Sequence, residues 1–138
     1  MPTNNDQARE MAKSFRDMSV ALGDYRFAHW GRLAPEERQR LENIEWTLLN
    51  NSSDLITMVV GLALAEVEKE FKAITAVIEH AREVLKTVTD FKNVLSLAAG
   101  VIALGAAIVV GVVSENPAPI IAAVTDFAAT LKVVAQTE

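Results

Sequence analysis

The sequence predicts an all-α fold: an elongated helical bundle with a long amphipathic central helix and a C-terminal hydrophobic helical hairpin. No stretch of the 138 residues alternates polar and apolar side chains for long, as a half-buried strand would. The four prolines stand at positions 2, 35, 117 and 119, where they separate helical segments instead of interrupting them. Charged residues are concentrated before Lys92, so the chain is polar at first and apolar at the end.

The composition limits the classes of function. Hydrophobic residues make up 51% of the chain, which excludes intrinsic disorder, and the length predicts a single all-α domain over residues 1–138. The chain has no cysteine, which excludes disulfides, thiolate metal sites and thiol nucleophiles. Thirteen basic and eighteen acidic residues give a net charge of −5, without the basic footprint of a nucleic-acid-binding protein. No nucleic-acid partner is therefore expected.

Residues 1–50 are predicted to form polar N-terminal helices. The first runs from Asp6 to Leu22, because apolar side chains recur there at the spacing of one helical face: Met11, Phe15, Met18 and Leu22. Gly23 is expected to end this helix. The connection from Gly23 to Ala34 is expected to pack onto the bundle, since it contains several large apolar side chains: Tyr25, Phe27, Trp30 and Leu33.

Pro35 is predicted to open a second helix that ends at Leu49, because proline lacks the N–H that a first helical position leaves unpaired. The two acidic residues that follow it suit the positive end of the helix dipole. Residues 50–54, with the sequence Asn-Asn-Ser-Ser-Asp, predict a break or a new N-cap.

Residues 53–92 are predicted to form an amphipathic heptad helix, typical of a coiled coil. Apart from Glu70, its seam positions are apolar and follow in steps of three and four residues: Val60, Ala63, Val67, Ile74, Val77, Ala81, Val84, Val88 and Phe91. An unbroken helix from Ser53 to Val113 would be about 90 Å long, much longer than a compact chain of this size. The stretch from Thr87 to Asp90 forms helix least readily and is the predicted break.

Residues 93–135 are predicted to form a hydrophobic helical hairpin. The 22 residues from Asn93 to Ser114 carry no charge, and a helix over Val94–Val113 is about 30 Å long, enough to span the hydrocarbon core of a bilayer. The turn is assigned to Asn116, Pro117 and Pro119. Residues 120–135 form the second arm.

Small residues within this hairpin indicate a flat helix face that lets another helix approach closely. The predicted membrane or helix-packing face consists of Ala99, Ala103, Gly105, Ala107, Gly111 and Ala122. The expected partners are a lipid bilayer or partner helices, including those of a homo-oligomer. A Gly105→Arg change is expected to abolish membrane insertion, or to unfold or disassemble a soluble bundle.

Three interpretations remain open at this point. The hairpin is a constitutive transmembrane element, or it is buried in a soluble or self-associating bundle, or it moves between the two states. The third interpretation resembles, in the architecture of residues 53–135, the helical pore-forming proteins, in which amphipathic helices shield an apolar hairpin until it meets lipid; no signature residue carries this likeness. The resemblance implies an oligomeric pore or another membrane-active component. The alternative function is a soluble, non-enzymatic interaction or scaffold protein.

The sequence predicts no enzyme, cofactor, metal site or small-molecule substrate. His29 and His80 are the only histidines, and neither belongs to a paired Glu-x-x-His repeat. The glycines fit no phosphate-binding motif. The polar N-terminal segment lacks the apolar core of a signal peptide, so synthesis in the cytoplasm is expected, with membrane association as a further possibility.

Overall fold

A computed structural model describes residues 4–59 and 68–137. Within these ranges the chain forms five α-helices and one 3₁₀ turn, and no strand occurs in them: α1 (Asn4–Ala28), η1 (Trp30–Arg32), α2 (Pro35–Val59), α3 (Glu68–Leu85), α4 (Phe91–Val113) and α5 (Ala118–Thr137). The predicted all-α bundle with a C-terminal pair of apolar helices is therefore confirmed.

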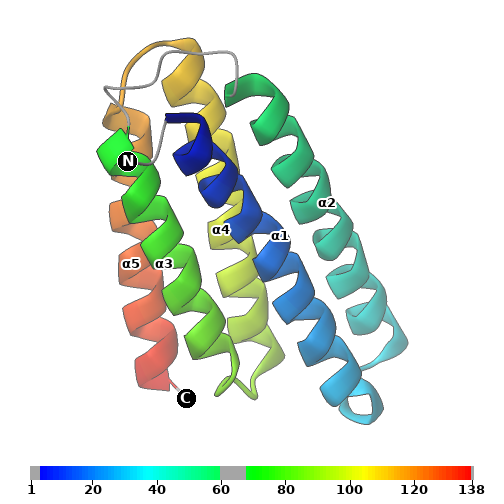
Figure 1. The fold of residues 1–138 in the computed structure, drawn as a ribbon. Coiled ribbons are helices and arrows are strands. Elements are labelled where there is room, and N and C mark those ends of the chain that lie inside the picture. The colour runs from blue at the N-terminus through cyan, green and yellow to red at the C-terminus, as the bar shows by residue number, and fades with distance from the viewer. Residues whose placement is uncertain (1–3, 60–67, 138) are drawn as a thin grey trace.

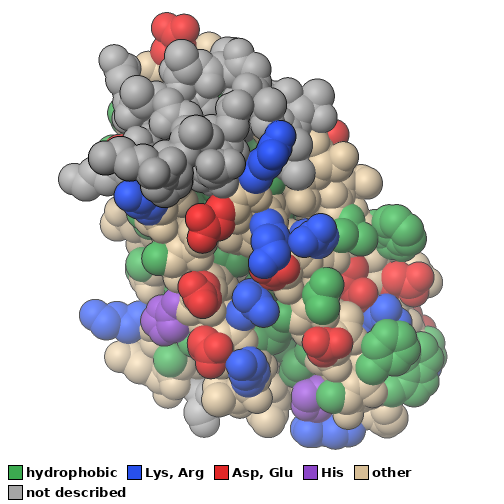
Figure 2. Space-filling model, viewed as in Figure 1, with side chains coloured by type: hydrophobic (Ala, Val, Ile, Leu, Met, Phe, Trp, Pro, Cys, Tyr) green, Lys and Arg blue, Asp and Glu red, His purple; other side chains and the backbone are tan. Residues whose placement is uncertain are grey.

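The helices lie side by side, and each runs antiparallel to the one before it (Figure 1). Helix α1 packs between α2 and α3, and α4 packs chiefly against α5. The α4–α5 hairpin meets the other three helices through contacts of α5 with α3 and of α4 with both α2 and α3. Acidic and basic side chains are interspersed over the face formed by α1 and α3 (Figure 2).

Helix α1 is longer than the sequence predicts. Its apolar stripe is fully buried, as expected: Met11, Phe15, Met18 and Leu22. The prediction that Gly23 ends the helix is wrong, because α1 continues to Ala28. A Cβ on Gly23 would lie 2.9 Å from Oε1 of Glu45, so the glycine leaves room for the end of the Glu45 side chain.

Helix α2 also continues past its predicted end at Leu49. The expected break at residues 50–54 is wrong, because α2 extends to Val59. Leu48, Ser52 and Leu55 are buried at helical spacing, so packing against the core holds this polar stretch helical.

The connection between α1 and α2 packs only in part as expected. Tyr25 and Leu33 are buried, whereas Phe27 and Trp30 are exposed. Packing of this stretch was predicted from its composition alone, and composition cannot tell which of its side chains face inward.

The predicted heptad helix over residues 53–92 is divided among three helices. Residues 53–59 end α2, α3 begins at Glu68, and the two helices run in opposite directions (Figure 1). Residues 60–67, including Val60, Ala63 and Val67, lie outside the described residues. Within α3 the predicted seam is buried at Ile74, Val77, Ala81 and Val84.

The predicted break near Thr87 is confirmed, since residues 86–90 are not helical. The Thr87 hydroxyl donates a hydrogen bond to the Val84 carbonyl, 2.9 Å away, at the end of α3. Asp90 then caps α4, because its carboxylate accepts a hydrogen bond from the Lys92 backbone N–H at 3.0 Å. This stretch therefore has a low helix propensity and also supplies the side chains that hydrogen-bond the unpaired backbone groups at the end of α3 and the start of α4.

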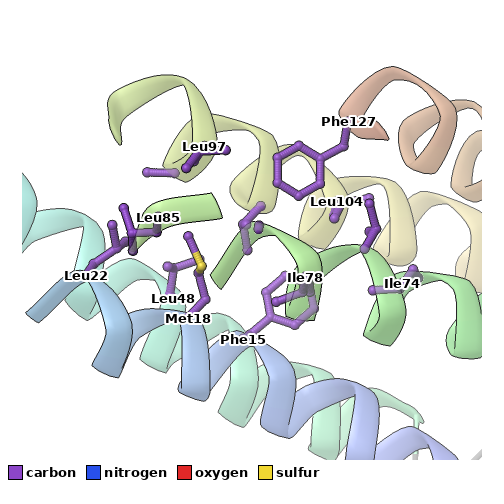
Figure 3. Packing of buried hydrophobic residues seen from close by; sticks show 14 of the residues in the cluster. Phe15, Met18, Leu22, Leu48, Ile74, Ile78, Leu85, Leu97, Leu104 and Phe127 are labelled. Atoms are coloured by element: carbon purple, nitrogen blue, oxygen red, sulfur yellow. The ribbon is translucent and has the colours of Figure 1, made fainter. Parts of the chain in front are cut away.

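All five helices contribute side chains to one buried apolar cluster (Figure 3). Phe15, Leu48 and Ile78 enter it from α1, α2 and α3, and Leu104 and Phe127 enter it from α4 and α5. The hairpin is therefore part of the same core as the polar helices that precede it.

Candidate functional site

The C-terminal hairpin consists of two helices that are long and apolar enough to cross a membrane, α4 and α5. Length and composition alone do not separate a membrane span from the core helix of a soluble bundle. What separates them is whether the bundle covers the apolar side chains, so the exposure of each helix face decides how the hairpin is interpreted.

The turn between α4 and α5 is closed by backbone and side-chain hydrogen bonds. Glu115 adopts a left-handed backbone conformation, with φ of 54°. The Asn116 N–H donates to the Gly111 carbonyl at 2.9 Å and the Glu115 N–H to the Val112 carbonyl at 3.2 Å, which is a Schellman motif. Asn116 Oδ1 accepts from the Ala118 N–H at 3.0 Å and caps α5, directly before Pro117. Pro119 lies in the first turn of α5.

Glycines form close contacts on α4. A Cβ on Gly111 would lie 2.7 Å from Ile120 of α5, and a Cβ on Gly100 would overlap the Phe127 ring. Gly105 faces the other way, where a Cβ would lie 3.2 Å from Asn51 of α2. The two glycines against α5 are eleven residues, or about three turns, apart, so they share one side of α4.

The predicted small-residue face is split between opposite sides of the helix. Gly105 and Gly111 are buried, Ala107 is half-buried, and Ala99 and Ala103 are exposed. Ala122 on α5 is exposed as well. The prediction treated these residues as one face because nearly every residue of this segment is apolar, so periodicity could not select the buried side.

The exposed side of α4 is a continuous apolar stripe, which we call the hairpin face. Its members follow in steps of four and three residues and are all exposed: Ala99, Ala103, Ala106, Val110 and Val113. Ala106, Val110 and Val113 were not identified from the sequence. Because almost every neighbouring residue of α4 is apolar as well, their spacing carries no signal that separates them from the buried side.

The hairpin face lacks charge along its whole length. Between Lys92 and Glu115, α4 contains no ionisable side chain. The exposed side of α5 is more polar, since Asp126 and Lys132 are exposed on it beside Ala122. The hairpin face therefore offers neither a charge nor a side-chain hydrogen bond to a ligand, and its chemistry is that of an apolar contact surface.

Neither histidine belongs to a cluster of metal-binding side chains within residues 4–59 and 68–137. The His29 ring stacks on Tyr25 with centroids 4.0 Å apart, and its Nδ1 lies 2.9 Å from the Tyr25 carbonyl oxygen. His80 is exposed on α3. In the described part of the chain, no three His, Cys, Asp or Glu side chains gather closely enough to hold a metal ion. No family model, curated protein or solved structure matches this chain.

Proposed function

We propose that this protein is a non-enzymatic, membrane-interacting helical protein that associates with a lipid bilayer through the hairpin face. One observation carries the proposal: the most apolar of the described helices, α4, leaves a charge-free side uncovered, from Ala99 to Val113. A helix that served only as the core of a soluble monomer would be covered on that side. Contiguous exposed apolar surface is typical of sites that contact membranes or other proteins.

The size of the uncovered surface favours peripheral and reversible contact. Beside the small alanines, the exposed valines of α4 are Val109, Val110 and Val113, which are about half exposed or more. Completing the burial of these side chains contributes about 3 kcal/mol in total. A single acyl chain contributes somewhat more and still anchors a protein only reversibly. Full insertion, or assembly of an oligomeric pore, requires in addition that α4 and α5 leave the shared core.

Flotation of the protein with lipid vesicles tests the proposal, and release of a trapped dye reports on pore formation. Ala103→Glu places a charge in the middle of the hairpin face and is expected to lower the bound fraction about tenfold. Ala76→Glu, at an exposed alanine of α3, is the matched control and is expected to bind as the wild type does. Equal binding of both variants, or no flotation with neutral or anionic vesicles, would contradict the proposal.

The Gly105→Arg change expected above to report on membrane insertion cannot do so. Gly105 is buried against Asn51 and Phe15, so an arginine there would disrupt the bundle whether or not lipid is present. Substitutions on the exposed stripe avoid this ambiguity.

The second candidate is a soluble interaction or scaffold protein that covers the hairpin face with a partner helix or with its own copy. Exposed small residues at steps of four and three, Ala99, Ala103 and Ala106, favour this because they let a second helix backbone approach closely. Ala103→Leu separates the two candidates. The larger apolar side chain is expected to strengthen binding to lipid and to weaken close helix packing. Flotation and light scattering of this one variant measure both outcomes.

A further inference from the structure

A second exposed apolar surface lies on α1, η1 and α2, away from the hairpin. It consists of Phe27, Trp30 and Trp46, whose side chains are 66%, 45% and 61% exposed, and we call it the aromatic surface. In Figure 2, apolar side chains gather at the right, over α2 and the end of α1. Trp30 and Trp46 are the only tryptophans in the chain. Exposed tryptophan in such a group is characteristic of protein contact sites.

Two rings of the aromatic surface, Phe27 and Trp30, are held in place before any partner arrives. The Phe27 and Trp30 rings are stacked, with centroids 5.9 Å apart and an angle of 11° between their planes. The Arg26 guanidinium lies 4.7 Å from the centre of Phe27, and that of Arg38 lies 4.4 Å from the centre of Trp30. Arg38 Nη1 also donates a hydrogen bond to the Trp30 carbonyl at 3.0 Å. These two side chains therefore have little freedom left to lose on binding.

The charges along this surface would complement those of a second copy of the chain related to the first by a two-fold axis. Arg38, Glu42 and Trp46 follow at four-residue steps, so they share one side of α2, and Arg38 lies against Trp30. A two-fold axis midway between positions 38 and 42 would align α2 antiparallel with α2 of a second copy. Arg38 would then face the second copy's Glu42, and the Phe27–Trp30 stack would face the second copy's Trp46.

The exposed area also suits the centre of a dimer interface. Aromatic side chains bury roughly 150–250 Å² each, so three rings that are about half exposed present on the order of 300 Å². A stable interface buries about 800 Å² on each partner, with a polar rim around an apolar centre. Exposed charged side chains lie near the rings in the sequence, among them Arg32 and Glu42, and are available for such a rim.

We propose that the aromatic surface is a self-association interface, at which two copies of this chain meet across a two-fold axis through antiparallel α2 helices. This interface is separate from the hairpin face and does not depend on the proposed membrane contact. Each copy contributes the same residues, so every contact between Arg38 and Glu42 occurs twice.

Charge-reversal variants test the interface in lipid-free buffer by sedimentation equilibrium. Arg38→Glu and Glu42→Arg each place like charges opposite one another twice, and each is expected to raise the dissociation constant by at least about tenfold. An equimolar mixture of the two variants restores both opposite-charge contacts and is expected to form a heterodimer. Glu79→Arg, at an exposed glutamate of α3, is the control and leaves the dimer intact. Glu42 also attracts Arg26 within the same chain, so Glu42→Arg could weaken the fold itself. Thermal unfolding of each variant checks that it is still folded.

Tryptophan fluorescence gives an independent reading, because both tryptophans lie in the proposed interface. Dilution of the wild type is expected to shift the emission to longer wavelength and to increase access of a soluble quencher. A strictly monomeric wild type with quencher-accessible tryptophans would overturn the inference, and so would a mixture of the two variants that stays monomeric. A dimer disrupted by Ala103→Glu but not by Trp46→Glu would also overturn it, since the hairpin face would then be the interface. Trp46→Glu is expected to leave vesicle binding unchanged, so failure of either proposal is distinguishable from failure of the other.

Discussion

At the scale of single residues, glycine decides how closely the helices of this bundle approach. Gly23 receives the Glu45 side chain, and Gly100 receives the Phe127 ring. Glycine inside a helix costs about 1 kcal/mol relative to alanine, so its presence is explained where a Cβ would meet a neighbour.

Replacing Gly100 tests this explanation directly. Gly100→Ala is expected to lower the free energy of unfolding by about 1–3 kcal/mol, because the new methyl group overlaps the Phe127 ring. The steric cost of this overlap exceeds the stability gained from the higher helix propensity of alanine. Urea unfolding followed by circular dichroism measures the change. Gly31→Ala is the control, since nothing lies within 4 Å of a Cβ there. A stabilised Gly100→Ala protein would mean that α4 and α5 are farther apart than described.

The ion pair between Arg26 and Glu45 is the second residue-scale determinant. Arg26 Nε lies 2.8 Å from Glu45 Oε2, and the two side chains are only 12% and 14% exposed. Hydrogen bonding to Glu45 raises the pKa of Arg26 above its ordinary value. Because the folded state holds the proton more tightly, the pair stabilises the fold at every pH below the unfolded-state pKa of Arg26, and this stability is lost only as the pH rises through the raised folded-state pKa. Arg26 therefore stays charged throughout the neutral range.

Glu45→Gln is expected to lower the free energy of unfolding by about 2 kcal/mol, because the half-buried Arg26 loses its hydrogen-bonded carboxylate and keeps only the attraction of Glu42. Thermal or urea unfolding measures the loss. Glu83→Gln removes the partner of Lys86 from an exposed pair and serves as the control, with an expected change within about 0.5 kcal/mol. Equal effects of both changes would show that the Arg26 pair is no more important than a surface pair.

At the scale of elements, the sequence predicts faces well where polar and apolar residues alternate at helical spacing. The α1 stripe from Met11 to Leu22 is buried as predicted, because charged neighbours mark the opposite side. In α4 almost every side chain is apolar, so the same reasoning could not distinguish buried Gly111 from exposed Ala103. The contacts of Phe127 and Ile120, which come from α5, make that choice.

Helix ends were predicted less well than helix faces for a related reason. Gly23 and residues 50–54 are poor helix formers, yet both are helical because their neighbours are buried against other helices. The break near Thr87 and the turn near Pro117 agree with local sequence, since Asp90 and Asn116 supply caps there. Local chemistry is decisive only where tertiary packing does not oppose it.

The α4–α5 turn offers an element-scale prediction. Glu115 occupies the left-handed position of the Schellman motif, which glycine adopts without the steric cost that a Cβ brings. Glu115→Gly is expected to raise the free energy of unfolding by about 0.5–1 kcal/mol. Ser114→Gly is the matched control, because φ of Ser114 is −86° and glycine there only adds freedom to the unfolded chain. Differential scanning calorimetry should show shifts of opposite sign, and a destabilised Glu115→Gly protein would contradict this account.

At the scale of the whole molecule, the two exposed apolar surfaces differ in chemistry. The hairpin face is aliphatic and uncharged, whereas the aromatic surface combines rings with arginine and glutamate. Lipid tails match the first kind of surface, and a folded protein matches the second. Their location on different helices allows both contacts to be tested separately by single substitutions.

The shared core predicts that the whole chain unfolds in one cooperative step. Apolar side chains of all five helices form one buried cluster, so α4 and α5 should not separate before the rest unfolds. Helix content and tryptophan fluorescence distinguish the possibilities, because Trp30 and Trp46 report only on η1 and α2. Early loss of the hairpin would remove the helical signal of 23 residues in α4 and 20 in α5 while fluorescence stayed constant.

We expect the urea transitions measured by the two probes to coincide, and Gly100→Ala to shift both to lower urea by the same amount. That variant changes a contact between α4 and α5, so a shift confined to circular dichroism would reveal an independent α4–α5 unit. Coincident transitions would have a consequence for membrane contact. Because the hairpin could not leave the core without unfolding the chain, the folded protein would meet a bilayer only through the uncovered side of α4, as a peripheral contact.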